Sequence, residues 1–170
     1  MIACLRLLSA LCLAALLAAC ASSPSSSLGE LPRTPDASIE QLLEQATNAK
    51  TPEKAALLRL SAADLAYQQN NPGRSSQILA QVPLDALKPA AQVFASTLAA
   101  ELAMGRNQPK AALAALNHPS LQNLKELPAD QQIRTGTVHA RAYEADGQTL
   151  AAARERVAMA PLLTAEAASS

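Results

Sequence analysis

The chain has 170 residues, and its 14 basic and 14 acidic residues cancel at neutral pH. With no net charge and no basic run, there is no electrostatic reason to expect nucleic-acid binding. Hydrophobic residues make up 49% of the chain and aromatic residues only 2%. Most of the apolar residues are Ala and Leu, which favour helices, whereas strands prefer β-branched and aromatic side chains. The composition therefore predicts an all-α protein.

Residues 1–19 are predicted to be a lipoprotein signal peptide. Arg6 is the only charged residue before Glu30, and an apolar run of 13 residues extends from Leu7 to Ala19. A membrane-spanning helix needs about 20 apolar residues, so a cleaved secretory signal is favoured over a membrane span. The stretch Leu17-Ala18-Ala19-Cys20 resembles the lipobox of bacterial lipoproteins. This resemblance implies cleavage before Cys20 and acylation of that residue.

Cys20 is thus the predicted lipidation site. Cys4 and Cys12 lie in the segment expected to be removed, so we expect the mature chain to have no disulfide and no free thiol. Several acyl chains on one cysteine give durable attachment, whereas a single chain of myristoyl size binds a membrane only weakly. The residue after Cys20 is Ala21 rather than the Asp that retains lipoproteins in the inner membrane of enteric bacteria. We therefore expect a lipid anchor in the outer membrane, with the protein facing the periplasm.

Residues 20–36 are predicted to form a flexible tether, because Ser and Pro dominate the stretch from Ser22 to Pro35. Fully extended, the segment spans at most about 50 Å, and its average span is nearer 20 Å. Such a tether clears the membrane surface but does not carry a domain far from it. The following domain is therefore expected to supply distance as well as contact.

Residues 37–170 are predicted to form a tetratricopeptide-like array of helical hairpins. Helix signals follow one another along the chain: a capping box at Ser38 and Gln41, a cap and proline at Thr51-Pro52, helix starts at Pro89, Pro109 and Pro128, a short turn of helix at 121–127, and a cap at Thr149. A third helix is expected around 78–82. Pro161 is expected to close the last element and Thr164 to cap a new one, which gives the domain a truncated C-terminus.

A weak internal repeat supports the array. Ala66-Tyr67, Ala103-Met104 and Ala142-Tyr143 each precede a polar turn, and the offsets between them are 37 and 39 residues. Stacked helix pairs show such a layout, although the tetratricopeptide period itself is 34 residues. An irregular bundle with helices of similar length is the alternative. The recurrence of Tyr67, Met104 and Tyr143 at one repeat position favours a packing role for these side chains.

Catalytic and cofactor motifs are not found. His118 precedes a proline in a turn and His139 lies on a long helix, and neither has Cys, His or paired carboxylates at metal-ligand spacing. There is no Ser-x-x-Lys box, nucleophile elbow or phosphate loop. We therefore expect a protein that is not an enzyme, with no catalytic residue, cofactor, metal or small-molecule substrate. Helical arrays of this kind act through a surface that binds a protein partner.

Two segments of the sequence resemble one protein family. Ala-Arg-Ala-Tyr-Glu-Ala-Asp-Gly-Gln (140–148) and Ala-Met-Ala-Pro-Leu-Leu (158–163), together with the lipobox and tether, resemble the N-terminal helical region of the LpoA (LppC) lipoproteins of Gram-negative bacteria. The resemblance implies an outer-membrane activator of a class A penicillin-binding protein, the bifunctional peptidoglycan synthase. Family members continue into a large domain that resembles periplasmic substrate-binding proteins, and we expect these 170 residues to correspond to the helical region alone. Only Cys20 is carried over as a functional residue.

Two other functions fit a helical array that faces the periplasm. One is the non-catalytic helical arm of a cell-wall hydrolase, because some lytic transglycosylases carry α-superhelical regions. The other is a general outer-membrane assembly scaffold with tetratricopeptide-like repeats, which a cleaner 34-residue consensus would have favoured.

Overall fold

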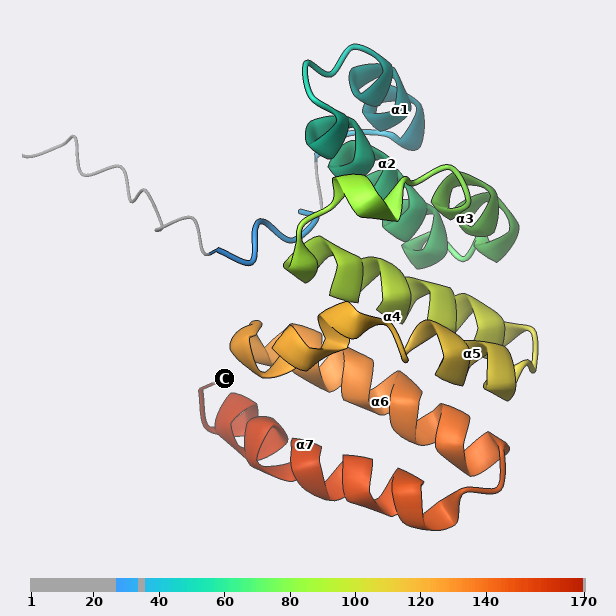
Figure 1. Ribbon diagram of the computed structural model, residues 1–170, viewed down its shortest axis with the longest axis vertical. Coiled ribbons are helices and arrows are strands. Elements are labelled where there is room, and N and C mark those ends of the chain that lie inside the picture. The colour runs from blue at the N-terminus through green and yellow to red at the C-terminus, as the bar shows by residue number, and fades with distance from the viewer. Residues whose placement is uncertain (1–26, 34–35, 170) are drawn as a thin grey trace, which may run out of the picture.

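The structure, a computed structural model, describes residues 27–33 and 36–169, and every regular element among them is a helix. The predicted signal peptide and Cys20 lie outside the described residues. The helices stack in chain order from one end of the molecule to the other (Figure 1). They are α1 (Ile39–Thr47), α2 (Pro52–Gln68), α3 (Pro72–Leu79), the 3-10 helix η1 (Leu84–Ala86), α4 (Pro89–Gly105), α5 (Pro109–Ala115), the 3-10 helix η2 (Pro119–Glu126), α6 (Ala129–Ala145) and α7 (Thr149–Ser169).

Three helical hairpins form the array, and these are α2–α3, α4–α5 and α6–α7. Helix α1 packs on α2 ahead of the first hairpin. Each later hairpin packs on the one before it, because α4 contacts both α2 and α3, and α6 contacts both α4 and α5. The all-α class and the helical-hairpin array are thereby confirmed, and the irregular bundle is the wrong alternative.

The turns inside the three hairpins share one backbone geometry. The residue after the helix cap has a positive φ each time, 58° at Asn70, 56° at Asn107 and 79° at Gly147. The next amide donates to a carbonyl five residues earlier, from Asn71 to Ala66, from Gln108 to Ala103 and from Gln148 to Tyr143. This is the Schellman motif, which ends a helix and reverses the chain. It repeats at offsets of 37 and 40 residues, so the third repeat is one residue longer than the sequence pattern indicated.

Side-chain caps begin the first three helices. Ser38 and Gln41 form the predicted capping box, with bonds of 3.2 and 2.8 Å to each other's amides. Thr51 accepts from the Lys54 amide at the start of α2. Asn71 caps α3 in the same way, so that helix begins earlier than its apolar residues suggested. Each cap satisfies an amide that has no partner inside the helix.

Alanine makes the close stacking possible. Ala62, Ala63 and Ala66 of α2 are completely buried, as are Ala100 of α4 and Ala142 of α6. Larger apolar residues such as Leu60, Leu98 and Val138 fill the space between neighbouring helices. Small side chains at the contacts let helix axes approach within about 8–10 Å.

The C-terminal helix differs from the prediction. Helix α7 runs without a break through Pro161, and Thr164 does not cap a new helix. The Thr164 hydroxyl instead donates to the Ala160 carbonyl four residues earlier, a bond made inside a helix. Thr149 is the first residue of α7 rather than its cap. Packing on α6 explains the continuity, because Met159 lies beside Gly136 and accepts from Thr137 just before the proline.

Part of the segment predicted as a tether is docked on the array. Leu28 and Leu31 pack against the apolar cluster around Val93, and the Leu28 carbonyl accepts from the Ala90 amide at 2.9 Å. Gly29 has a φ of 86° and lies so close to Lys88 that a Cβ at this position would come within 2.5 Å of the Lys88 Cβ. Leu28 and Leu31, inside the predicted tether, are therefore docked on the array.

In the part of the chain that the structure describes, no helix is both long and apolar enough to cross a membrane.

Candidate interaction surface

An ionic cluster crosses the first helices of the three hairpins. Arg134 of α6 donates two hydrogen bonds to Glu101 of α4, from Nε to Oε1 at 2.9 Å and from Nη2 to Oε2 at 2.6 Å. The same Nη2 atom donates to Oδ1 of Asp64 on α2 at 2.8 Å. The side chains of Asp64 and Glu101 are only 10% and 15% exposed. One guanidinium therefore ties three successive hairpins together through charge-assisted bonds.

The surroundings of Arg134 favour its charged form. Its guanidinium carbon lies 4.7 Å from the centre of the Phe94 ring, a cation–π distance. Burial acts to lower the pKa of Arg134, but the hydrogen bonds and charges of Glu101 and Asp64 outweigh it and raise that pKa far above its usual range. Because the pair with Glu101 is bidentate and partly buried, it holds a fixed geometry that an exposed pair does not.

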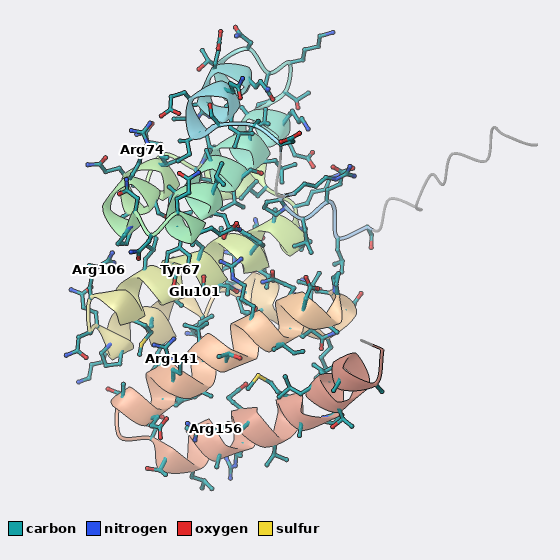
Figure 2. The ribbon with its side chains drawn as sticks, turned by 180° about the vertical axis from the view of Figure 1, so that it is seen from behind. Tyr67, Arg74, Glu101, Arg106, Arg141 and Arg156 are labelled. Carbon is teal, nitrogen blue, oxygen red and sulfur yellow. The ribbon has the colours of Figure 1, made fainter. Side chains whose placement is uncertain are left out.

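Two neighbours complete the cluster. Gln68, one turn beyond Asp64, donates to the second carboxylate oxygen of Asp64. Tyr67 is half-buried near Glu101, and Figure 2 shows the two side chains next to each other on this face. The pKa of Tyr67 is raised, first by burial and then by the negative charge of Glu101. Tyr67 therefore stays protonated at neutral pH and presents a hydroxyl beside the charged groups.

A neutral network lies beneath the ionic cluster. The hydroxyls of Thr97 on α4 and Thr135 on α6 are 2.8 Å apart and both residues are fully buried. One hydroxyl donates to the other, the accepting hydroxyl can donate to a carbonyl of its own helix, and Gln131 donates to Thr135. Buried polar groups with all partners in place fix one arrangement of the two helices, so this network aligns the second hairpin with the third.

Both histidines make contacts with neighbouring residues of the fold. The His118 Nδ1 atom accepts from the Ser120 amide at 3.2 Å and so caps η2. His139 stacks on Tyr143 with ring centres 4.4 Å apart, and its Nδ1 atom lies 3.4 Å from Glu155 of α7. Burial lowers the pKa of His139, and the opposing effect of Glu155 is smaller. His139 is therefore in contact with side chains of both α6 and α7.

The repeat register explains how the ionic cluster arises. Asp64, Glu101 and Arg141 occupy equivalent positions, because each precedes the Schellman carbonyl of its own hairpin by two residues. Leu57, Phe94 and Arg134 are likewise equivalent, because each lies about two helical turns before the first set of positions in its helix. Asp64, Glu101 and Arg134 were not predicted from the sequence, because their spacing matches no catalytic motif. The 37-residue offset between the two carboxylates was the available signal.

Within the described residues, no group of three or more His, Cys, Asp or Glu side chains is arranged to hold a metal ion. The charged groups of the cluster are saturated by one another, which is typical of a structural element. The arrangement can hold the three hairpins in a fixed geometry, and repeat arrays of this kind present side chains on an extended surface.

The fold and this surface define a helical-hairpin repeat protein of the tetratricopeptide-like class. A family model described as "LppC putative lipoprotein" matches residues 32–170. The chain therefore belongs to the LppC lipoprotein family, and the resemblance seen in the sequence is confirmed.

One solved structure supports the same fold. It is Haemophilus influenzae LpoA, in a monoclinic crystal form with two molecules per asymmetric unit, and the two chains are 20% identical. The match has a TM-score of 0.54 and covers 75% of this chain and 22% of that one. This chain thus spans less than a quarter of the length of the solved protein. Among curated proteins, none matches.

Proposed function

We propose that this protein is an outer-membrane lipoprotein that activates a class A penicillin-binding protein through protein–protein contact, with no catalysis of its own. The observation that carries the proposal is the family match over residues 32–170. The neighbouring structure, LpoA of Haemophilus influenzae, shares the helical fold. In this role the partner is the bifunctional peptidoglycan synthase, and the helical domain serves as spacer and interaction surface.

The spacer role has a structural basis. Arg134 binds carboxylates from the first and second hairpins, and the Thr97–Thr135 contact joins the second to the third. Partly buried, hydrogen-bonded links of this kind resist bending far better than exposed ion pairs, which contribute about 0–1 kcal/mol each. A stiff array keeps a bound partner at a set distance from the anchor.

The activity is tested with a purified class A synthase and lipid-linked substrate, with and without the full chain. We expect faster glycan-chain polymerisation or more peptide crosslinks when the chain is present. Unchanged rates of both reactions at saturating protein would refute activation by this chain. A binding measurement in parallel, by microscale thermophoresis, separates an inactive complex from no complex.

The anchor is tested separately. We propose that the chain is cut before Cys20 and that Cys20 is acylated. Mass spectrometry of the mature N-terminal peptide should show Cys20 as its first residue with added acyl chains, and the protein should fractionate with the outer membrane. Cys20→Ser should leave the protein in the soluble periplasmic fraction. An unmodified Cys20 in the membrane-bound wild type would contradict the proposal.

A further inference from the structure

Four arginines follow one another down the array, with at least one from each hairpin. Arg74 lies at the start of α3, Arg106 in the turn after α4, Arg141 near the end of α6 and Arg156 on α7. Figure 2 shows them in this order from one end of the molecule to the other. We call these four residues the arginine row.

The two central members have no carboxylate partner among the described residues. Arg106 is exposed and donates to neutral oxygens, the Ser76 hydroxyl at 3.1 Å and the Gln108 side-chain carbonyl at 3.2 Å. Arg141 is exposed and makes neither an ion pair nor a hydrogen bond with its side chain among those residues. Both guanidiniums therefore keep donors free for an external carboxylate.

The two outer members have partners that are easily exchanged. Arg74 pairs with Glu40 at 2.9 Å, with side chains 41% and 72% exposed, and Arg156 pairs with Glu144, with side chains 49% and 60% exposed. Exposed pairs of this kind contribute only about 0–1 kcal/mol. An incoming carboxylate can compete for these arginines at little cost.

The carboxylates of the ionic cluster are already occupied. Both oxygens of Glu101 bind Arg134, and Asp64 is held by Arg134 and Gln68. These two acids cannot turn toward Arg141 or Arg106 without abandoning the ionic cluster. The cluster thus engages these two carboxylates with Arg134 and leaves the two central arginines without a carboxylate partner among the described residues.

The spacing suits an extended chain. The elements that carry successive arginines are in contact, α3 with α4, α4 with α6 and α6 with α7, and packed helices lie about 8–10 Å apart. An extended peptide advances about 3.3 Å per residue. One step along the array therefore corresponds to about three peptide residues, so acidic side chains at every third position can meet successive arginines.

We propose that the arginine row binds an acidic segment of a partner protein in extended conformation. The inference rests on the proposed function only in taking this domain as a protein-binding surface, and it does not require the partner to be a synthase. Two guanidiniums without a carboxylate partner among the described residues, two in exposed ion pairs and their placement along the three hairpins supply the charge complementarity.

The test uses a fluorescent twelve-residue peptide with Glu at every third position and Ser or Thr between. The control peptide has the same sequence with Gln in place of every Glu. Binding to the full chain is followed by fluorescence anisotropy at two salt concentrations. The test variant is Arg106→Glu with Arg141→Glu. The matched control is Lys50→Glu with Lys125→Glu, which makes the same charge change at exposed lysines in the α1–α2 loop and at the end of η2.

We expect the Glu peptide to bind and the Gln peptide to bind at least tenfold more weakly, with affinity falling as salt rises. The arginine variant should lose at least tenfold for the Glu peptide, and the lysine control should change less than twofold. Equal binding of the two peptides, or equal loss in both variants, would overturn the proposal. So would binding to phosphatidylglycerol vesicles with no binding to the Glu peptide, because the target would then be a lipid surface.

The outcome is independent of the synthase assay. Peptide binding without stimulation of a synthase would support the arginine row and refute the proposed function. Stimulation of the synthase that persists in the arginine variant, with no peptide binding by the wild type, would support the proposed function and refute the arginine row. Circular dichroism and the melting temperature of each variant confirm that it is folded.

Discussion

Removing the charge of Arg134 tests the ionic cluster most directly. Arg134→Met keeps an unbranched side chain over Phe94 but deletes all three hydrogen bonds to Asp64 and Glu101. Two carboxylates that are 10% and 15% exposed are then left without their cation. The variant therefore measures what it costs to bury unpaired charge where three hairpins meet.

The expected loss in the free energy of unfolding is about 3–5 kcal/mol, the cost of breaking a buried pair by removing one partner. For a domain of this size each kcal/mol lowers the melting temperature by roughly 4 °C, so we expect a fall of about 12–20 °C. Arg134→Lys should give a smaller loss, since it keeps the charge but cannot make the bidentate contact with Glu101. Urea unfolding followed by circular dichroism gives the two losses in free energy, and thermal unfolding gives the change in melting temperature.

A neutral version of the cluster is the control. Asp64→Asn and Glu101→Gln, added to Arg134→Met, remove the unpaired charges, and this variant should recover at least half of the loss. The reasoning is refuted if Arg134→Met alone costs less than 1 kcal/mol, or if the triple variant is as unstable as the single one. The first result would mean that the carboxylates reach water freely, and the second that shape rather than charge holds the hairpins.

Three further predictions concern pH, turns and caps. Burial lowers the pKa of His139, so the unfolded state takes up a proton at a higher pH than the folded state does. The free energy of unfolding should therefore fall as pH drops below about 6.5. His139→Gln should flatten this part of the stability profile, and a profile unchanged by the substitution would contradict the prediction. Asn107→Gly should stabilise by up to about 1 kcal/mol and Gly147→Ala destabilise by about 1 kcal/mol in urea melts, because both residues have positive φ; a loss for the glycine variant would refute the turn assignment. Thr51→Ala should cost about 1 kcal/mol by removing the α2 cap, and a neutral result would show that the cap is dispensable.

The array could be predicted because local signals agreed with the final packing. Prolines at Pro52, Pro89 and Pro109 mark real helix starts, and the polar turns mark real hairpins. Such signals depend on a few neighbouring residues and therefore survive without knowledge of the fold. The family resemblance carried by residues 140–148 and 158–163 was also sound.

Other features depend on contacts that a local pattern does not contain. Pro161 looks like a helix end, but packing of Met159 against Gly136 keeps α7 continuous around it. The serine- and proline-rich segment looks free throughout, yet Leu28 and Leu31 bury against α4. The Arg134 cluster joins residues 33 and 70 positions apart, so only the repeat register could have suggested it.

The docking of Leu28 on α4 also decides how the domain carries mechanical load. A pull on the N-terminus reaches Leu28 first, and the hydrogen bond to Ala90 passes the force directly to the second hairpin. The chain between residue 31 and α4, which includes α1, α2 and α3, stays slack until that contact detaches. In a stretching experiment with handles at residues 27 and 169, the second and third hairpins should therefore bear the tension first. The first hairpin should extend only after the contact between Leu28 and Ala90 is broken.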